Sequence, residues 1–337
     1  MVDLLSVVYT LRAREITTAS GIGLVVDSST IEVGNSAVVA RCKIVGSEQR
    51  MMLKCYYRTR RNAAIIYGSA YKRRELGVRT LRGFTEYIDI LLLPWIEGTP
   101  LDGLLNNPSA DYASLSREFD RMAYDLLGRP KAHGDIKPEN IIVREDGTME
   151  LVDWDGAWEP HLHYNEGDEV GTAQYRHPLR RGIDFGKSID DYSIALLSTM
   201  LAALATKQEL FESLLSADKT LFDPQLIARH ADEVLERAIA TFVECRDVAH
   251  YRIATSLYSP TISLYGLRTF LEAAISVLPK SISEDAEVER NGVHWGLKDG
   301  GSWVVPAIFD SVVMTRGGCY LAYDDYDLTL SIAKRPL

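Results

Sequence analysis

The sequence predicts an α+β protein in which a small antiparallel sheet with one helix precedes a mostly helical part. Runs of β-branched and aromatic residues, separated by turn signals, dominate the first 96 of the 337 residues. Apolar residues then recur at helical spacing from Leu115 to Leu127, and the patterns from Ile189 to Leu278 are helical again. Strand-and-turn patterns return after Pro279 and predict a small C-terminal β module.

Changes in composition predict the domain boundaries. The run Glu97-Gly98-Thr99-Pro100 separates strand patterns from helical ones, and the polar run KSISEDAEVE is typical of a linker. The predicted organisation is an N-terminal extension (1–28), a first lobe (29–96), a second lobe (97–279), a linker (280–289) and a small β module (290–337).

The first lobe has the predicted order β-β-β-α-β-β. A break at Gly34-Asn35-Ser36-Ala37 separates the first two strands, and Gly46-Ser47-Glu48 predicts the next turn. The expected elements are strands over 29–33, 38–45 and 50–57, a helix over 61–76, and strands over 79–84 and 88–95. Tyr56 and Tyr67 are expected to be ordinary strand and core residues.

The second lobe begins with the amphipathic helix over 115–127, which Gly128 and then Pro130 end. A loop over 131–140 precedes two short strands, 141–143 and 149–153, and Asp146-Gly147 between them predicts a hairpin. The apolar run from Ile194 to Ala205 is shorter than the roughly 20 residues that span a bilayer, so we expect a buried helix and no membrane span.

Composition restricts the function classes. Lys and Arg total 37 and Asp and Glu total 47, a net charge of −10, which argues against a general nucleic-acid coat protein. The four cysteines form no C-x-x-C pair, so neither a zinc site nor a disulfide framework is indicated. The N-terminal residues show no basic stretch leading into an apolar run, so we expect no signal peptide and a cytoplasmic location.

Positive charge is concentrated between Arg50 and Arg82. This segment holds ten basic residues and one acidic residue, Glu75. One interpretation is a solvated helix face, and the other is a surface that attracts an acidic partner or another polyanion.

The densest group of chemistry-bearing residues is His133-Gly134-Asp135-Ile136-Lys137-Pro138-Glu139-Asn140, followed by Asp153-Trp154-Asp155. An aspartate on a loop can accept a hydroxyl proton, and a lysine two residues later can lie beside a phosphate. Asn140 and Asp153 offer hard oxygen ligands suited to Mg²⁺, and the predicted hairpin brings them close together. Phosphoryl transfer needs this combination of groups.

These motifs resemble those of the protein kinase-like superfamily, in particular bacterial eukaryotic-like Ser/Thr kinases, over roughly residues 29–279. The run HGDIKPEN is similar to the catalytic loop of that family, and Asp153-Trp154-Asp155 is similar to its metal-binding triplet. The series continues in register with the segments 52–55, 93–98, 171–175 and 190–193. The resemblance implies a bilobal protein kinase-like fold and an ATP- and Mg²⁺-dependent transfer of phosphate to protein Ser/Thr hydroxyls.

Carried over by position, the resemblance implies a role for each matching residue. Asp135 would orient and deprotonate the acceptor hydroxyl, and Lys137 would neutralise the transferring phosphoryl group. Asn140 and Asp153 would hold Mg²⁺. Lys54 would contact the ATP phosphates, with Glu75 on the first-lobe helix as its acidic partner. The implied nucleotide contacts comprise the phosphate-covering Gly34, Asn35 and Ser36, and the hinge residues Leu93, Pro94 and Ile96 beside the adenine.

The sequence departs from the family pattern at four places. One glycine remains of the three in the phosphate-covering loop, and Gly134 replaces the arginine that usually precedes the catalytic aspartate, as in non-RD kinases. Asp155 replaces the glycine of the metal-binding triplet. His177-Pro178-Leu179 stands where the family has Ala-Pro-Glu. None of the four removes a group that the chemistry needs.

Two alternatives to a protein kinase stay open. The reduced glycine loop and the altered triplet also suit a pseudokinase, a nucleotide-binding signalling module without transfer. Small-molecule phosphotransferases of the aminoglycoside kinase-like type share His-Gly-Asp with Asn five residues later. Lys137-Pro138-Glu139 and the helix start at Asp190 favour the protein kinase. At the C-terminus, the run from Gly292 to Asp310 is similar to one WG-type β repeat.

Overall fold

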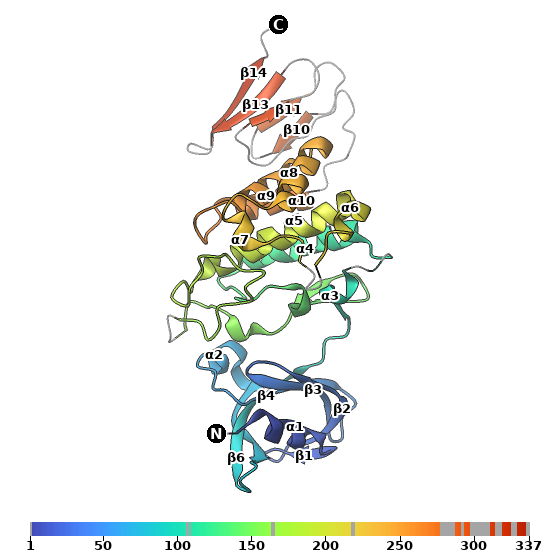
Figure 1. The fold of residues 1–337 in the computed structure, drawn as a ribbon, viewed down its shortest axis with the longest axis vertical. Helices are drawn as coiled ribbons and strands as arrows, with labels where there is room; N and C mark the ends of the chain where they lie inside the picture. Colours follow the sequence, from blue (N-terminus) through green and yellow to red (C-terminus); the bar gives the residue numbers. More distant parts are fainter. Residues whose placement is uncertain are drawn as a thin grey trace.

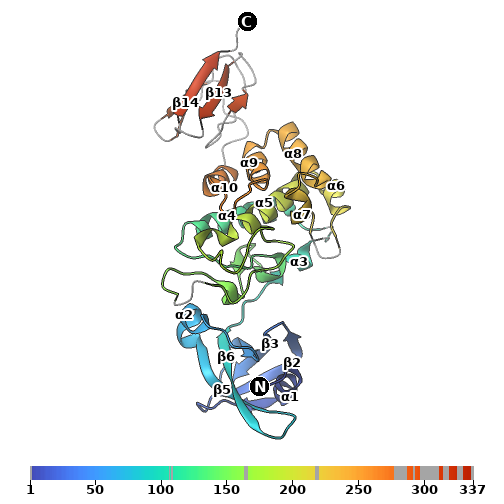
Figure 2. The same cartoon turned by 60° about the vertical axis from the view of Figure 1, so that its left-hand side comes forward.

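The computed structural model describes residues 2–105, 107, 109–162, 166–216 and 220–276, and the backbone of five short strands between 287 and 334 (Figure 1). Its mixed α/β fold combines an antiparallel six-stranded sheet with a group of helices. We call residues 2–96 the sheet part and residues 97–276 the helical part. The two lie end to end, with helix α2 at their junction (Figure 2).

The six strands of the sheet part follow the order β1-β2-β3-β4-β6-β5. Their bounds are β1 Glu15–Thr17, β2 Gly23–Val33, β3 Ala37–Ile44, β4 Arg50–Tyr56, β5 Tyr71–Arg79 and β6 Thr85–Pro94. Helix α1, Leu4–Arg12, begins at Asp3, whose side chain accepts from the backbone N–H of Ser6, and it buries Val7 and Leu11 in the core of the sheet. The expected N-terminal extension is therefore wrong as a separate segment, because α1, β1 and the start of β2 belong to the sheet part.

The predicted helix over 61–76 is wrong beyond residue 67. Helix α2 spans Ala63–Tyr67, a 3₁₀ turn η1 covers Gly68–Ala70, and strand β5 starts at Tyr71. The pairing of β5 with β6 shifts register between Lys72 and Leu76, and Arg74 has a positive φ of 50°. This bulge breaks the alternation of buried and exposed residues that marks a strand in sequence.

The helical part confirms the predicted amphipathic helix, hairpin and central apolar helix. Its elements are β7 Thr99–Pro100, α3 Leu101–Leu104, α4 Tyr112–Leu127, η2 Pro138–Asn140, β8 Ile141–Val143, β9 Met149–Leu151, η3 Trp154–Gly156, η4 Lys187–Asp190, α5 Asp191–Thr206, α6 Gln208–Glu212, α7 Pro224–Ile227, α8 Glu233–Cys245, α9 Val248–Ser256 and α10 Leu267–Ile275. Asp111 caps α4 by accepting from the N–H of Ser114 at 3.1 Å. At the β8–β9 turn Gly147 has φ +84°, a conformation that favours glycine.

Helix α5 is the centre of the helical core. Every residue from Asp191 to Leu204 is buried, and α4 and α9 pack against it. In the described part of the chain, the helical stretch Lys187–Thr206 alone has the length and composition of a membrane span. Because 89% of its apolar window is buried inside the protein, the stretch serves as a core helix.

The described C-terminal strands form two small antiparallel sheets. Strands β10, Glu287–Arg290, and β11, Val293–Gly296, make a hairpin, and β12 Ser311–Val313, β13 Cys319–Asp324 and β14 Thr329–Lys334 pair in that order. The predicted linker therefore ends earlier than residue 289. Most of the WG-like run, residues 297–310, lies outside the described residues.

A buried charged cluster joins α4 to the start of α9. His250 Nε2 lies 2.9 Å from Asp120 Oδ2, and His250 Nδ1 lies 2.6 Å from Asp247 Oδ2. The hydroxyl of Ser198 donates to Asp120 Oδ1 at 2.6 Å. Burial lowers the pKa of His250, but the two carboxylates outweigh this effect and raise it from 6.5 to about 10.

This cluster predicts a pH dependence of stability. The folded-state pKa of His250 lies above its unfolded value, so its stabilisation is complete below about pH 6.5 and is lost as the pH rises through about 10. We expect the Tm to fall by several degrees over this range, at roughly 2–4 °C per kcal/mol for a protein of this size. In His250→Gln the fall should be distinctly smaller, and calorimetry of the two proteins at matched pH values measures the difference. Equal falls would contradict the assignment.

Candidate active site

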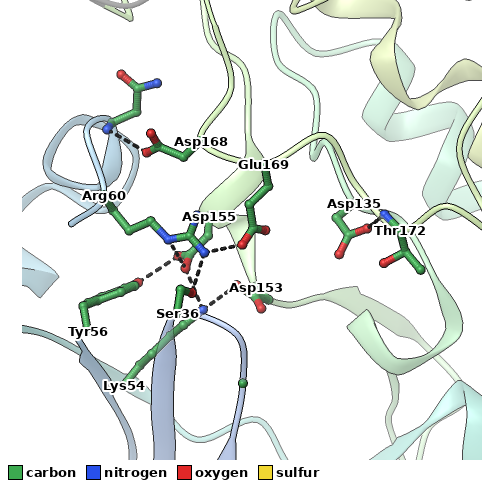
Figure 3. Close-up of polar contacts among 12 residues, drawn as sticks. Ser36, Lys54, Tyr56, Arg60, Asp135, Asp153, Asp155, Asp168, Glu169 and Thr172 are labelled. Atoms are coloured by element: carbon green, nitrogen blue, oxygen red, sulfur yellow. Dashed lines mark hydrogen bonds and ion pairs between the residues drawn. The ribbon is translucent and has the colours of Figure 1, made fainter. Parts of the chain in front are cut away.

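Four of the residues singled out from the sequence, Ser36, Lys54, Asp135 and Asp153, lie at the junction of the two parts (Figure 3). Lys54 comes from β4 of the sheet part, and Asp153 follows β9 in the helical part. Their side chains meet, with Lys54 Nζ 2.6 Å from Asp153 Oδ1, although 99 residues separate them. This contact joins the two parts at the proposed site.

Buried polar contacts fix the loop before η2. Asp190 accepts from the backbone N–H groups of Gly134, at 2.7 Å, and of His133. Burial raises the pKa of Asp190, against the effect of these hydrogen bonds. His133 is fully buried and its Nε2 lies 2.8 Å from the carbonyl oxygen of Val152. The loop is thereby held against η4, which leads into α5, and against Val152, which follows β9.

Asp135 lies at the centre of this loop. Its Oδ1 accepts from the N–H of Thr172 at 2.6 Å, and its backbone oxygen accepts from Asn140 Nδ2 at 2.8 Å. Lys137 Nζ lies 3.7 Å from Asp135 Oδ2. The structure therefore brings Asp135, Lys137 and Asn140 together beside the segment that carries Thr172.

Asp153 has an exposed side chain next to Asn140. The N–H of Val152, the residue before Asp153, donates to the carbonyl oxygen of Asn140 at 2.9 Å, so Asn140 lies beside the segment that leads into Asp153. Asp153 is left-handed, with φ 64° and ψ 65°, and its side chain is 47% exposed. Desolvation raises the pKa of Asp153, but the Lys54 ammonium outweighs it and holds the pKa below its ordinary value.

The predicted phosphate-covering residues Gly34, Asn35 and Ser36 form the tight turn between β2 and β3. The N–H of Gly34 donates to the carbonyl oxygen of Ala37 at 2.9 Å, and Tyr57 Oη donates to that of Gly34 at 2.5 Å. Ser36 accepts a hydrogen bond from Arg60. The turn is therefore short and tied down, and Figure 3 shows Ser36 beside Lys54.

The predicted hinge residues lie where the sheet part ends. Leu93 pairs with Met52 in the β4–β6 ladder, and Pro94 is the last residue of β6. Trp95 donates to the carbonyl oxygen of Arg50 at 2.9 Å, and Ile96 follows it toward the helical part. The hinge segment is therefore anchored on the strand that carries Lys54.

Glu75 does not pair with Lys54, which corrects the expected ion pair. It lies on β5 instead of a helix, and it accepts from the backbone N–H of Ser20 at 3.1 Å and from the Ser20 hydroxyl. Desolvation raises the pKa of Glu75, but hydrogen bonds from Ser20 and Thr18 outweigh it and lower the value. Helix α2, only five residues long, contains no carboxylate that could take its place.

The sequence motifs did not predict Asp155 as a residue of the site. Its Oδ2 lies 2.8 Å from Lys54 Nζ, and its Oδ1 accepts from both Tyr56 and Tyr67, each at 2.8 Å. Burial raises the pKa of both tyrosines, and the nearby carboxylate adds to this effect. Tyr56 and Tyr67 pack in the core as expected, and both also bind Asp155, a contact that the sequence patterns did not predict. The one signal in the sequence for the role of Asp155 was that a carboxylate stands where the resembled family has glycine.

The basic segment divides into paired and exposed residues. Arg60 pairs with Glu169, Arg61 Nε lies 2.9 Å from Asp168 Oδ1, and Arg50 Nη1 lies 2.7 Å from Glu97 Oε1. Arg50 and Arg61 are exposed despite these ion pairs, and the other exposed members are Arg58, Arg73, Arg74, Arg79 and Arg82. A helix face is ruled out because most of these residues lie on or beside strand β5.

Among the described residues, no group of three His, Cys, Asp or Glu side chains could hold a metal ion by itself. No family model matches the chain, and no curated protein is similar to it in sequence. The geometry of the site therefore carries the functional argument.

Proposed function

We propose that this site transfers the terminal phosphoryl group of ATP, with Mg²⁺, to a Ser or Thr hydroxyl of a protein, within a bilobal protein kinase-like fold. The observation that carries the proposal is the contact of Lys54 with Asp153 across the junction of the two parts. It joins a cation suited to phosphates with a carboxylate suited to a metal, and Asp135 lies on the neighbouring loop.

The residues present fit Mg²⁺ bound together with a nucleotide. Asp153 offers an exposed carboxylate and Asn140 an amide oxygen, which are the hard ligands that Mg²⁺ prefers. A site with two protein ligands suits a metal that completes its coordination with waters and substrate phosphates. Bound there, Mg²⁺ would neutralise charge on the phosphates.

The chain's own residues would then divide the remaining work. Asp135 would accept the proton of the acceptor hydroxyl, and Lys137, 3.7 Å from it, would neutralise the transferring group. Leu93, Pro94 and Ile96 would line the adenine side. An acceptor would enter beside Gly171–Tyr175, the segment that includes the N–H bound to Asp135.

One observation favours the pseudokinase alternative. Hydrogen bonds from Tyr57 to Gly34 and from Arg60 to Ser36 hold the β2–β3 turn in place. A turn fixed in this way covers phosphates less closely than a glycine-rich loop does. In that case the protein would bind nucleotide without transferring phosphate.

Asp153→Ala is expected to weaken ATP binding in the presence of Mg²⁺ by about tenfold or more, because a metal ligand is lost from a site with few. Titration calorimetry with ATP, with and without Mg²⁺, measures the effect. Asp146→Asn in the exposed β8–β9 turn is the control and should bind as the wild type does. Nucleotide affinity of the wild type that is independent of Mg²⁺ would count against the metal site.

A further inference from the structure

We propose that Asp155 is the residue that positions Lys54 for the nucleotide phosphates, in place of a carboxylate from a first-lobe helix. The inference deepens the proposed function and rests on it. In the sequence motifs, Asp155 stands out only because it replaces the glycine of the metal-binding triplet.

The contacts of Lys54 single out Asp155. The side chain of Lys54 is 8% exposed, and its described ion pairs go to Asp153 Oδ1 at 2.6 Å and to Asp155 Oδ2 at 2.8 Å. A buried ammonium needs a close counter-ion, because leaving it unpaired is costly. Glu75, the carboxylate expected for this purpose, is engaged with Ser20 on β5.

The two carboxylates differ in exposure, and this difference separates their roles. The side chain of Asp153 is 47% exposed, whereas that of Asp155 is 2% exposed. Asp153 is therefore the one that a metal ion can reach. Asp155 would remain with Lys54 if Asp153 bound a metal ion, and it would then still hold the ammonium in place.

Asp155 is itself held by groups from the opposite part of the molecule. Tyr56 on β4 and Tyr67 at the end of α2 both donate to its Oδ1 at 2.8 Å. Arg60 Nε lies 3.6 Å from its Oδ2, and the Arg60 guanidinium also pairs with Glu169. Two hydroxyl donors and two cations thus surround one carboxylate, and Figure 3 shows Tyr56, Lys54 and Arg60 beside it. They also tie η3 of the helical part to the sheet part.

A double-mutant cycle on the full chain tests this role through the Kd for ATP with Mg²⁺. Asp155→Asn is near-isosteric and can still accept from both tyrosines, so it removes mainly the charge. We expect it to raise the Kd by about tenfold in the wild-type background, and by less than about twofold in Lys54→Met, because a residue that acts through Lys54 has no effect once Lys54 is gone. A merely structural role would give the same factor in both backgrounds.

Two further variants serve as a control for the loss of a buried carboxylate and as a substitute for Asp155→Asn. Asp120→Asn removes another buried carboxylate, one in the His250 cluster and outside the site, and it should leave the Kd unchanged while lowering the Tm. The double variant Tyr56→Phe/Tyr67→Phe keeps the charge of Asp155 but removes its two donors, and it should raise the Kd by about threefold. It therefore replaces Asp155→Asn if that protein does not fold.

The outcomes separate the inference from the proposed function. A wild type that does not bind ATP in any condition overturns the proposed function, and the positioning role with it. A wild type that binds ATP, together with an unchanged Kd in Asp155→Asn or equal factors in both backgrounds, overturns the role of Asp155 alone.

Discussion

Asp135→Asn is expected to lower the rate of phosphoryl transfer by about 1,000-fold, because it removes the carboxylate that we propose accepts the hydroxyl proton. The affinity for ATP with Mg²⁺ should stay within about twofold of the wild type, since the proposed role of Asp135 is to contact the acceptor and not the nucleotide. Steady-state rates at saturating ATP, together with a nucleotide titration, measure both quantities.

The asparagine variant is well matched to this purpose. Its amide oxygen can still accept from the N–H of Thr172, which donates to Asp135 Oδ1 at 2.6 Å, so the variant keeps this hydrogen bond. Asp27→Asn on β2, whose described side-chain partners are Ser29 and Arg41, serves as the control. Activity of Asp135→Asn within tenfold of the wild type would contradict the proposed role.

Gly134→Ala is expected to destabilise the protein by about 3 kcal/mol or more, the largest effect on stability that we predict. Gly134 has φ +88°, and a Cβ built there would lie 2.0 Å from the carbonyl oxygen of Gly156. Because that atom belongs to the backbone of η3, no side-chain rotation can relieve the clash. An arginine at this position also has a Cβ, so it would clash with the carbonyl oxygen of Gly156 in the same way.

Gly147→Ala is the matched control for Gly134→Ala. Gly147 has nearly the same φ, +84°, but a Cβ there would meet nothing within 4 Å, so the cost should be the backbone strain alone, about 1 kcal/mol. Urea unfolding of both variants gives the two free energies. Similar losses at the two positions would show that the close approach of Gly134 to Gly156 is not needed for the fold.

Local signals predicted the elements that depend on local chemistry. The spacing of apolar residues predicted α4, and Asp146-Gly147 predicted the β8–β9 turn. The uniformly apolar run after Asp190 predicted the buried helix α5. In each case neighbouring residues determine the outcome, through helical spacing, a cap or a positive φ.

Strand β5 could not be predicted in the same way. Its buried residues Tyr71, Leu76 and Val78 do not alternate regularly, because the bulge at Arg74 inserts residues out of phase. The sequence there is basic and follows a short helix, so its pattern suggested a longer helix. Assigning Glu75 to Lys54 depended on that helix and was wrong for the same reason.

In the site, too, the residues that are close in sequence could be predicted and the contacts between distant segments could not. Asp135, Lys137, Asn140 and Asp153 lie within one short stretch, so their spacing was enough to place them near one another. The partners of Asp155 come from β4 and α2, about ninety to a hundred residues away in the chain. No local pattern marks such a contact, and Asp155 was therefore noticed only as a departure from a motif.

The most direct test of the proposed function is transfer of the terminal phosphate of γ-³²P-labelled ATP by the full chain, with generic Ser/Thr protein substrates and with aminoglycosides as separate acceptors. We expect label on protein Ser or Thr, and we expect its transfer to require Mg²⁺. Label on the small molecules alone, or ATP binding without transfer to any acceptor, would contradict it.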